Sequence, residues 1–107
     1  MSSVRGDVHR LKTPKGVMGR EQSGARFAVV VQSDDLFTST LIVVPTSTSA
    51  VDMTHRPKVT VQGRATLALA EQVMTIDPTR LGDRVGRLSI GDMTALDDAL
   101  RLTMALR

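Results

Sequence analysis

One arginine stands where a glycine-containing segment meets an apolar run. The segment Gly19-Arg20-Glu21-Gln22-Ser23-Gly24-Ala25-Arg26-Phe27 directly precedes Ala28-Val29-Val30-Val31, which predicts a loop that delivers Arg26 to the beginning of a buried strand. Glycines permit positive backbone angles and close approach to a ligand, and a guanidinium held at a strand end can clamp a phosphate with paired donors. Arg26 is therefore a candidate phosphate-binding residue. A strand-end arginine more often forms a surface salt bridge or is solvated, so this segment by itself leaves that alternative open.

The length and composition favour one small globular domain. A chain of 107 residues can build one modest core but not two, so we expect residues 1–107 to form a single domain. Hydrophobic residues make up 41% of the chain, yet no apolar stretch approaches the roughly 20 residues of a membrane helix. The N-terminus lacks the apolar segment of a secretory signal, and the chain has no cysteine for disulfides or thiolate chemistry. A cytoplasmic location without a membrane anchor is the expectation.

Positive charge is concentrated in the N-terminal part of the chain. Residues 1–30 carry six Lys and Arg side chains and two acidic ones. A basic excess around a glycine-containing loop suits a polyanion such as nucleic acid. Phe27 and Phe37 are the only aromatic residues, however, which weighs against a surface that binds RNA purely by stacking bases on rings.

Short apolar runs separated by turn residues predict strands, and one amphipathic segment predicts a terminal helix. The strands are expected over residues 4–11, 26–32, 41–44, 57–61, 65–76 and 84–88. Residues 45–50 are expected to form a hydroxyl-rich loop, and Asp77-Pro78 to begin a short helix that ends at Gly82. Ser89 and Asp92 resemble a capping box for a helix over residues 90–106. A parallel α/β sheet would need a helix between successive strands, so the pattern favours a mainly β fold, an SH3-like small barrel with a C-terminal helix.

Six motifs follow one another along the chain. They are Arg5-Gly6-Asp7-Val8, Gly19-x-Glu21-Gln22-x-Gly24-x-Arg26, Ala28-Val29-Val30-Val31-Gln32, Leu41-Ile42-Val43-Val44-Pro45-Thr46-Ser47, Leu69-Ala70-Glu71-Gln72-Val73-x-Thr75-Ile76-Asp77, and Arg80-Leu81 with Gly86-Arg87-Leu88. Together they resemble a known family, the MazF/PemK toxins of bacterial type II toxin–antitoxin systems, whose fold group includes the CcdB toxins. The likeness covers nearly the whole chain in order.

The resemblance implies a homodimeric endoribonuclease that cuts single-stranded RNA at short sequences without a metal ion or cofactor and is silenced by a MazE-like antitoxin. In that family a loop arginine and a hydroxyl residue at the end of a later strand form the catalytic pair. Arg26 matches the arginine, and Ser47 matches the hydroxyl. Many relatives have threonine there, so Thr46 or Thr48 becomes the counterpart if the alignment shifts by one residue.

This assignment agrees with the chemistry of RNA. The 2′-hydroxyl can attack the neighbouring phosphorus to give a 2′,3′-cyclic phosphate and a free 5′-hydroxyl, while the enzyme aligns the attack and stabilises the charged phosphorane. Arginine has too high a pKa to act as an ordinary base, so Arg26 is assigned to charge stabilisation and Ser47 to a hydrogen bond. Glu21 is a third catalytic candidate, either as the base or as an ion-pair partner that orients Arg26.

The same likeness makes residues 12–24 the segment that contacts RNA and that antitoxin covers. Gln72 could read a base edge through its amide, or form a core or subunit-interface pair with its neighbour Glu71. The complete set of candidate RNA-binding residues is Lys12, Lys15, Arg20, Gln22, Gly24, Phe27, Thr46, Thr48 and Gln72.

Two departures from the family pattern bear on base recognition. His9 stands where relatives commonly have an aromatic residue, and Phe27 stands where they have proline, so His9, Phe27 or the arginines are the candidates for stacking. His9 and His55 have no cysteine or acidic cluster at ligand spacing, so no metal site is expected. Two other function classes remain open at this point: a CcdB-like toxin that acts on DNA gyrase, and a non-catalytic barrel that binds RNA or protein.

Overall fold

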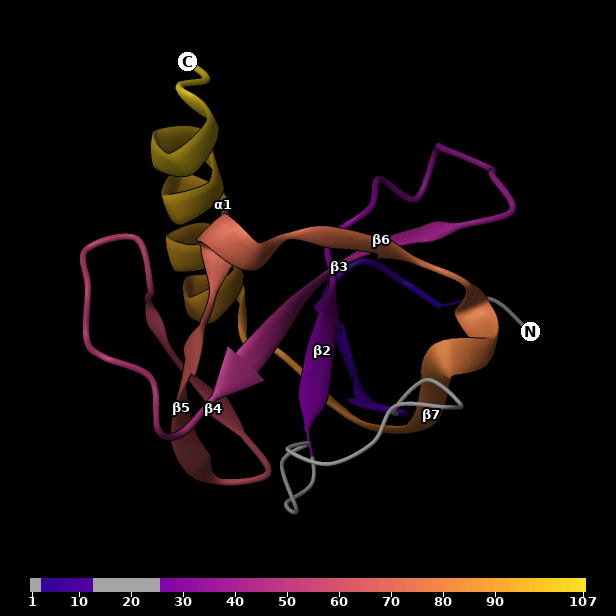
Figure 1. The fold of residues 1–107 in the computed structure, drawn as a ribbon, viewed down its shortest axis with the longest axis horizontal. Helices are drawn as coiled ribbons and strands as arrows, with labels where there is room; N and C mark the ends of the chain where they lie inside the picture. The colour runs from indigo at the N-terminus through magenta and orange to yellow at the C-terminus, as the bar shows by residue number, and fades with distance from the viewer. Residues whose placement is uncertain (1–2, 13–25) are drawn as a thin grey trace, which may run out of the picture.

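The computed structural model describes residues 3–12 and 26–107, and within them seven strands form one curled antiparallel sheet (Figure 1). The strands pair in the order β4-β5-β3-β2-β1-β7, and β6 pairs with the first half of β3. A helix, α1, follows the last strand at the C-terminus. The elements are β1 (Asp7–Leu11), β2 (Phe27–Val30), β3 (Leu41–Ser47), β4 (Lys58–Val61), β5 (Arg64–Ala68), β6 (Met74–Ile76), β7 (Leu81–Arg87) and α1 (Ile90–Met104).

The sheet curls into a half-barrel that buries both of its faces. In Figure 1, β6 and β7 curve around one side of β1, β2 and β3, and β4, β5 and α1 lie on the other side. Alternate residues of β2 therefore enter different cores: Val29 packs with Leu96 and Leu100 of α1, whereas Val30 packs with Val43 and Ile76. Burial on both faces was expected from the continuous β-branched runs in these two strands, and the structure confirms it.

The short connections match their sequence signals. Gln62 and Gly63 have φ angles of 52° and 76°, and they join β4 to β5 in a two-residue turn of the kind that needs positive φ at both positions. The Asp77 side chain accepts a hydrogen bond from the Thr79 N–H and begins the 3₁₀ helix η2 (Pro78–Arg80). Ser89 caps α1 by accepting from the Asp92 N–H, as expected. The Asp92 carboxylate accepts from Thr60 N–H on β4 and thereby ties the helix to the sheet.

Several expected boundaries were wrong. Residues 65–76 do not form one strand: β5 and β6 are separated by the 3₁₀ helix η1 (Ala70–Gln72), because the small, fully buried Ala70 permits a tight turn against the core. Residues 45–47 extend β3 instead of opening a loop, since the Pro45 carbonyl still accepts a hydrogen bond from Leu69 N–H at 2.9 Å. The last strand begins at Leu81, and α1 ends at Met104, which is exposed.

A buried carboxylate fixes the pairing of β1 with β7. The Asp7 side chain, 7% exposed, lies 3.1 Å from Arg84 Nε and 3.0 Å from Arg87 Nη1 and accepts a hydrogen bond from Val4 N–H. Gly6 permits this turn through a φ of 97°. Burial acts to raise the pKa of Asp7, but the Val4 N–H and the two guanidinium groups outweigh burial and lower the pKa below its usual value.

Because the pKa of Asp7 is lower in the folded chain, its contribution to stability is present above the unfolded pKa of about 3.9 and is lost as the pH falls through the folded value. We expect Asp7→Asn to lower the free energy of unfolding by about 1–3 kcal/mol near neutral pH and by less in acid. Urea unfolding of both chains at neutral and acidic pH measures this difference. Asp98→Asn, which disrupts the exposed pair with Arg101, is the control and should change little. An Asp7→Asn effect that is equal at both pH values would contradict the assignment.

Candidate active site

The pairing of β2 with β3 brings Arg26 and Ser47 to the same edge of the sheet. Ala28 is the partner of Pro45, and Thr46 Oγ1 donates to the Phe27 carbonyl at 3.4 Å. Continued beyond the paired residues, this register sets Ser47 opposite Arg26. Opposite residues of an antiparallel pair project from the same face, so a guanidinium and a hydroxyl share one face at the edge where β2 begins and β3 ends.

Hydrogen bonds hold the backbone at Arg26 and at Lys12. The Arg26 carbonyl accepts a hydrogen bond from Leu11 N–H at 2.8 Å, and Arg26 is half-buried. Lys12 N–H donates to the Arg80 carbonyl at 2.8 Å, and the Arg80 side chain donates back to the Lys12 carbonyl from Nε and Nη2. Residues 12 and 26, at the two ends of the intervening segment, are thus fixed to the barrel. No function was predicted for Arg80 from the sequence. The structure shows that its side chain anchors Lys12.

The three candidate hydroxyl groups have different surroundings. Thr46 is 5% exposed and its Oγ1 is hydrogen-bonded within the sheet, so the predicted contact of Thr46 with RNA is not supported. Ser47 is half-buried at the end of β3, and its Oγ accepts from Ser49 N–H at 3.2 Å. Thr48 is exposed in the following loop. Of the three, Ser47 is the one that the extended β2 and β3 register sets opposite Arg26.

The two stacking candidates also differ. The Arg10 guanidinium lies over the Phe27 ring, 5.5 Å from its centroid, and Phe27 is half-buried against the core. His9 is 7% exposed, with Nδ1 3.0 Å from the Gly82 carbonyl oxygen and Nε2 3.4 Å from Ser3 Oγ. Burial of His9 does not support the stacking role considered for it. Among the arginines considered for stacking, Arg10 is the one that the register of β1 with β2 sets opposite Phe27.

Glu71 and Gln72 were expected in a strand, but they lie in η1. Glu71 Oε2 accepts hydrogen bonds from Arg56 Nε and Nη2 at 3.1 and 2.6 Å, and Glu71 Oε1 lies 3.5 Å from His55 Nε2. The Arg56 hydrogen bond lowers the pKa of Glu71 below its ordinary value against the opposing effect of burial. Gln72 is exposed, so its amide can be reached by a ligand.

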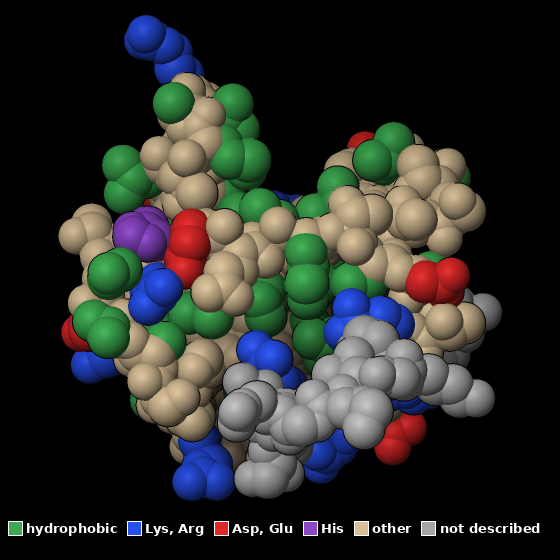
Figure 2. Space-filling model, viewed as in Figure 1, with side chains coloured by type: hydrophobic (Ala, Val, Ile, Leu, Met, Phe, Trp, Pro, Cys, Tyr) green, Lys and Arg blue, Asp and Glu red, His purple; other side chains and the backbone are tan. Residues whose placement is uncertain are grey.

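Basic side chains surround the edge where β2 begins. Figure 2 shows Lys and Arg side chains over the lower part of the molecule, where Figure 1 places the start of β2 and the curve of β7. The described basic residues at this edge are Arg10, Lys12, Arg26 and Arg80. The remaining candidates, which are Lys15, Arg20, Glu21, Gln22 and Gly24, lie outside the described residues.

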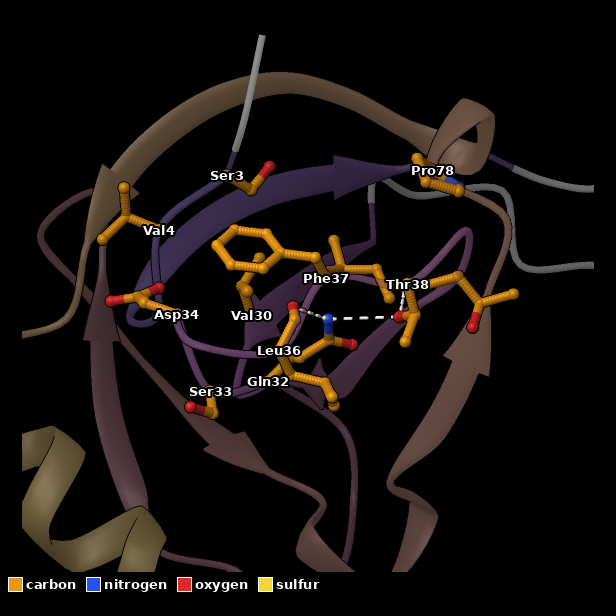
Figure 3. Close-up of a pocket in the computed structure, with 12 residues that line it drawn as sticks. Ser3, Val4, Val30, Gln32, Ser33, Asp34, Leu36, Phe37, Thr38 and Pro78 are labelled. Atoms are coloured by element: carbon orange, nitrogen blue, oxygen red, sulfur yellow. Dashed lines mark hydrogen bonds between the residues drawn. The ribbon is translucent and has the colours of Figure 1, made fainter.

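A separate hollow of about 500 Å³ lies at the other end of β2 and β3. Figure 3 shows Val30, Phe37 and Gln32 around it, and the Gln32 amide donates to the Leu36 carbonyl and lies 3.4 Å from Thr38 Oγ1. Among the described residues that line this hollow, Asp34 is the one that carries a charge. A lining with a carboxylate and, in the described part of the chain, no cation does not suit a phosphate, whereas the Arg26 edge has several basic residues.

Two further properties concern metal ions and membranes. Within residues 3–12 and 26–107, no group of three or more His, Asp or Glu side chains could hold a metal ion. No helix in the described part of the chain is long and apolar enough to cross a membrane.

Solved structures agree with the expected fold. An endoribonuclease from a mycobacterial species, in complex with its cognate antitoxin, superposes with a TM-score of 0.79 at 19% identity, covering 99% of this chain and 98% of that one. MazF of Deinococcus radiodurans superposes with a TM-score of 0.76 at 17% identity, covering 97% of both chains. These likenesses confirm the small-barrel architecture with a C-terminal helix.

Sequence comparisons identify the family. A Mycobacterium tuberculosis protein described as a candidate toxin is 36% identical over 104 residues, which cover 96% of this chain and 98% of that protein. Endoribonuclease EndoA of Bacillus subtilis is 32% identical over 110 residues, which cover 95% of this chain and 94% of EndoA. The family model for PemK-like, MazF-like toxins of type II toxin–antitoxin systems matches residues 4–104. The chain therefore belongs to the PemK/MazF toxin family.

Proposed function

We propose that this toxin is a metal-independent endoribonuclease that cuts single-stranded RNA at the edge formed by Arg26 and Ser47. The observation that carries the proposal is the register of β2 with β3, which sets these two residues opposite each other. Its homologue from Bacillus subtilis is named as an endoribonuclease, and that homologue spans nearly the whole of this chain. The basic residues around the same edge favour a polyanionic substrate.

In the proposed reaction the 2′-hydroxyl oxygen attacks the adjacent phosphorus and the bond from phosphorus to the 5′-oxygen breaks. The products are a 2′,3′-cyclic phosphate and a 5′-hydroxyl, and the proton lost by the 2′-hydroxyl is balanced by the proton gained by the leaving oxygen. Arg26 stabilises the added negative charge on the phosphorane with its planar donor array. Ser47 donates a hydrogen bond to a phosphate oxygen, and Glu21 is either the base or the ion-pair partner of Arg26.

RNA binding in this proposal involves both charge and stacking. Lys12 and the predicted residues of the adjoining segment contact phosphates, and the exposed Thr48 and Gln72 offer hydrogen bonds to bases. The Arg10 and Phe27 pair offers a planar surface at the same edge. RNA recognition by this chain would therefore differ from that of proteins that stack bases on several aromatic rings.

The proposal includes the partners and location expected for such a toxin. A mycobacterial endoribonuclease and MazF of Deinococcus radiodurans have each been solved with an antitoxin. By analogy, a MazE-like antitoxin binds this chain and blocks its RNA-binding edge. The proposal further comprises a single domain over residues 1–107, a homodimer and action in the cytoplasm.

One experiment separates this proposal from the two other function classes. The purified chain is incubated with a long single-stranded RNA in excess chelator, and in parallel with DNA gyrase in a supercoiling assay. RNA cutting with unaffected gyrase supports the proposal. Intact RNA with inhibited gyrase would indicate a CcdB-like toxin, and RNA that is bound but intact would indicate a non-catalytic binding protein.

The identity of the hydroxyl residue gives a further prediction. We expect Ser47→Ala to slow RNA cleavage by about 10²-fold, the size of effect seen when one donor to a charged transition state is removed. Thr48→Ala should change the rate of the chemical step less, because Thr48 lies in the exposed loop beyond the end of β3 and is not set opposite Arg26 by the strand register. Single-turnover cleavage of one defined RNA compares both variants. A larger loss for Thr48→Ala than for Ser47→Ala would shift the assignment to Thr48.

A further inference from the structure

Arg56 lies near the C-terminal end of the loop between β3 and β4, residues 48–57, and holds this loop to Glu71. The Arg56 side chain, 16% exposed, donates from Nε and Nη2 to Glu71 Oε2 and from Nη1 to the Val51 carbonyl at 3.0 Å. The Arg56 N–H also donates to the Met53 carbonyl at 2.9 Å. One guanidinium therefore joins the middle of the loop to a carboxylate outside it.

The carboxylate at the other end of this contact is on a rigid support. Glu71 lies in η1, whose Ala70 is completely buried and which contacts both α1 and β3. Val73 N–H donates to the Ala70 carbonyl and closes the turn. The contact of Arg56 with Glu71 thereby anchors the loop to an element that packs on the core of the barrel.

The near end of the same loop holds the hydroxyl of Ser47. Ser49 N–H donates to Ser47 Oγ at 3.2 Å, and the two hydroxyl oxygens lie 3.3 Å apart. A serine hydroxyl has one proton and two lone pairs, so an N–H that occupies a lone pair leaves the proton of Ser47 to be donated elsewhere. Ser49 lies two residues before Val51, whose carbonyl accepts a hydrogen bond from Arg56. The Arg56 contact is therefore close along the loop to the group that binds the Ser47 hydroxyl.

We propose that Arg56 is a positioning residue for RNA cleavage, and that it acts through the loop and Ser49 to orient the Ser47 hydroxyl as a donor toward the phosphate. The inference rests on the proposed function, because it assigns Ser47 to the reacting phosphate. Arg56 itself does not touch the RNA. Its removal leaves the barrel folded and loosens the loop that orients the Ser47 hydroxyl.

The test is a double-mutant cycle between Arg56→Met and Ser47→Ala, measured as kcat and KM on one defined RNA. Arg101→Met is the matched control, because it removes an arginine from an exposed pair with Asp98 on α1. Thermal unfolding of every variant monitors the fold. Arg56→Lys is the second variant, because a lysine keeps the charge but cannot contact Glu71 and Val51 with a rigid fork.

We expect Arg56→Met to lower kcat by about tenfold and to change KM by less than it changes kcat, since small misplacement of a reacting group costs up to about 10²-fold. In the Ser47→Ala background the same substitution should have almost no effect, because the hydroxyl it positions is gone. Arg56→Lys should fall between the wild-type chain and Arg56→Met, and Arg101→Met should match the wild-type chain. If Arg56→Met does not fold, the same cycle with Arg56→Lys decides the question.

An equal loss of kcat in both backgrounds would overturn the positioning role while leaving the role of Ser47 intact. A wild-type rate for Arg56→Met would overturn it as well. Failure of the wild-type chain to cut RNA is a different result, because it would remove the proposed function and the positioning role together.

Discussion

The Arg26→Ala variant is expected to cut single-stranded RNA about 10²- to 10³-fold more slowly than the wild-type chain, the loss typical of removing a main donor to transition-state charge. Arg26 lies opposite Ser47 in the β2 and β3 register, and its backbone is held by Leu11. In the proposed reaction the Arg26 guanidinium stabilises the negative charge of the phosphorane, and its removal leaves that charge without this donor. Single-turnover cleavage at saturating enzyme measures the effect on the chemical step.

Two matched variants sharpen this result. Arg26→Lys keeps the positive charge but loses the planar pair of donors, so it should recover only part of the rate. Arg64→Ala removes an exposed arginine at the beginning of β5 and should retain a nearly wild-type rate. A folded Arg26→Ala chain that cuts RNA as fast as the wild type would remove Arg26 from the chemistry.

The largest expected effect on stability comes from the helix. Leu96 is completely buried in the core between α1 and the sheet, so Leu96→Ala is expected to lower the free energy of unfolding by about 2–5 kcal/mol. The loss combines the transfer of the removed methyl groups with the cavity that remains. Denaturant unfolding monitored by circular dichroism measures it.

Leu102→Ala is the control for this change, because Leu102 lies on the same helix and is 58% exposed. Surface substitutions of this kind usually change stability by less than about 0.5 kcal/mol. Equal effects of the two substitutions would mean that α1 does not pack on the sheet as described.

Much of the fold could be predicted because local patterns and tertiary packing agree. Val29, Val30, Val43 and Val44 lie in continuous β-branched runs, and both faces of their strands are buried. Ser89 caps the terminal helix as expected, and Leu96 and Leu100 of this helix lie in the core. In these elements each residue prefers locally the structure that the whole fold requires.

The errors occur where tertiary contacts override local preference. Residues 65–76 mix helix-favouring Ala and Leu with strand-favouring Val, Thr and Ile, and the core contacts of Ala70 break that stretch with a 3₁₀ turn. Pro45 suggested a loop, but a proline lacks only the N–H, and its carbonyl continues the sheet. Gly82 was expected to end a helix, yet it lies in β7 close to Arg10, where a Cβ would come within 3.2 Å of the arginine side chain.

The candidate site was predictable only in part. Arg26 was predicted as a phosphate-binding residue from the glycine-containing segment before it, and Ser47 from the family resemblance. The register of β2 with β3, continued beyond the paired residues, sets the two opposite each other. The contacts of Arg10 with Phe27 and of Arg56 with Glu71 carried no signal in the sequence, because each joins residues that are distant along the chain. Contacts of this kind depend on how strands pair and loops close, which composition and periodicity do not determine.

The chemistry of the cut RNA ends is the most direct test of a nuclease centred on Arg26 and Ser47. A defined single-stranded RNA is incubated with the purified chain in excess chelator, and the fragment ends are identified by mass spectrometry. The expected result is a 2′,3′-cyclic phosphate on one fragment and a 5′-hydroxyl on the other, with neither formed by Arg26→Ala. Fragments that carry 5′-phosphates, or RNA that stays intact with the wild-type chain, would contradict the proposed reaction.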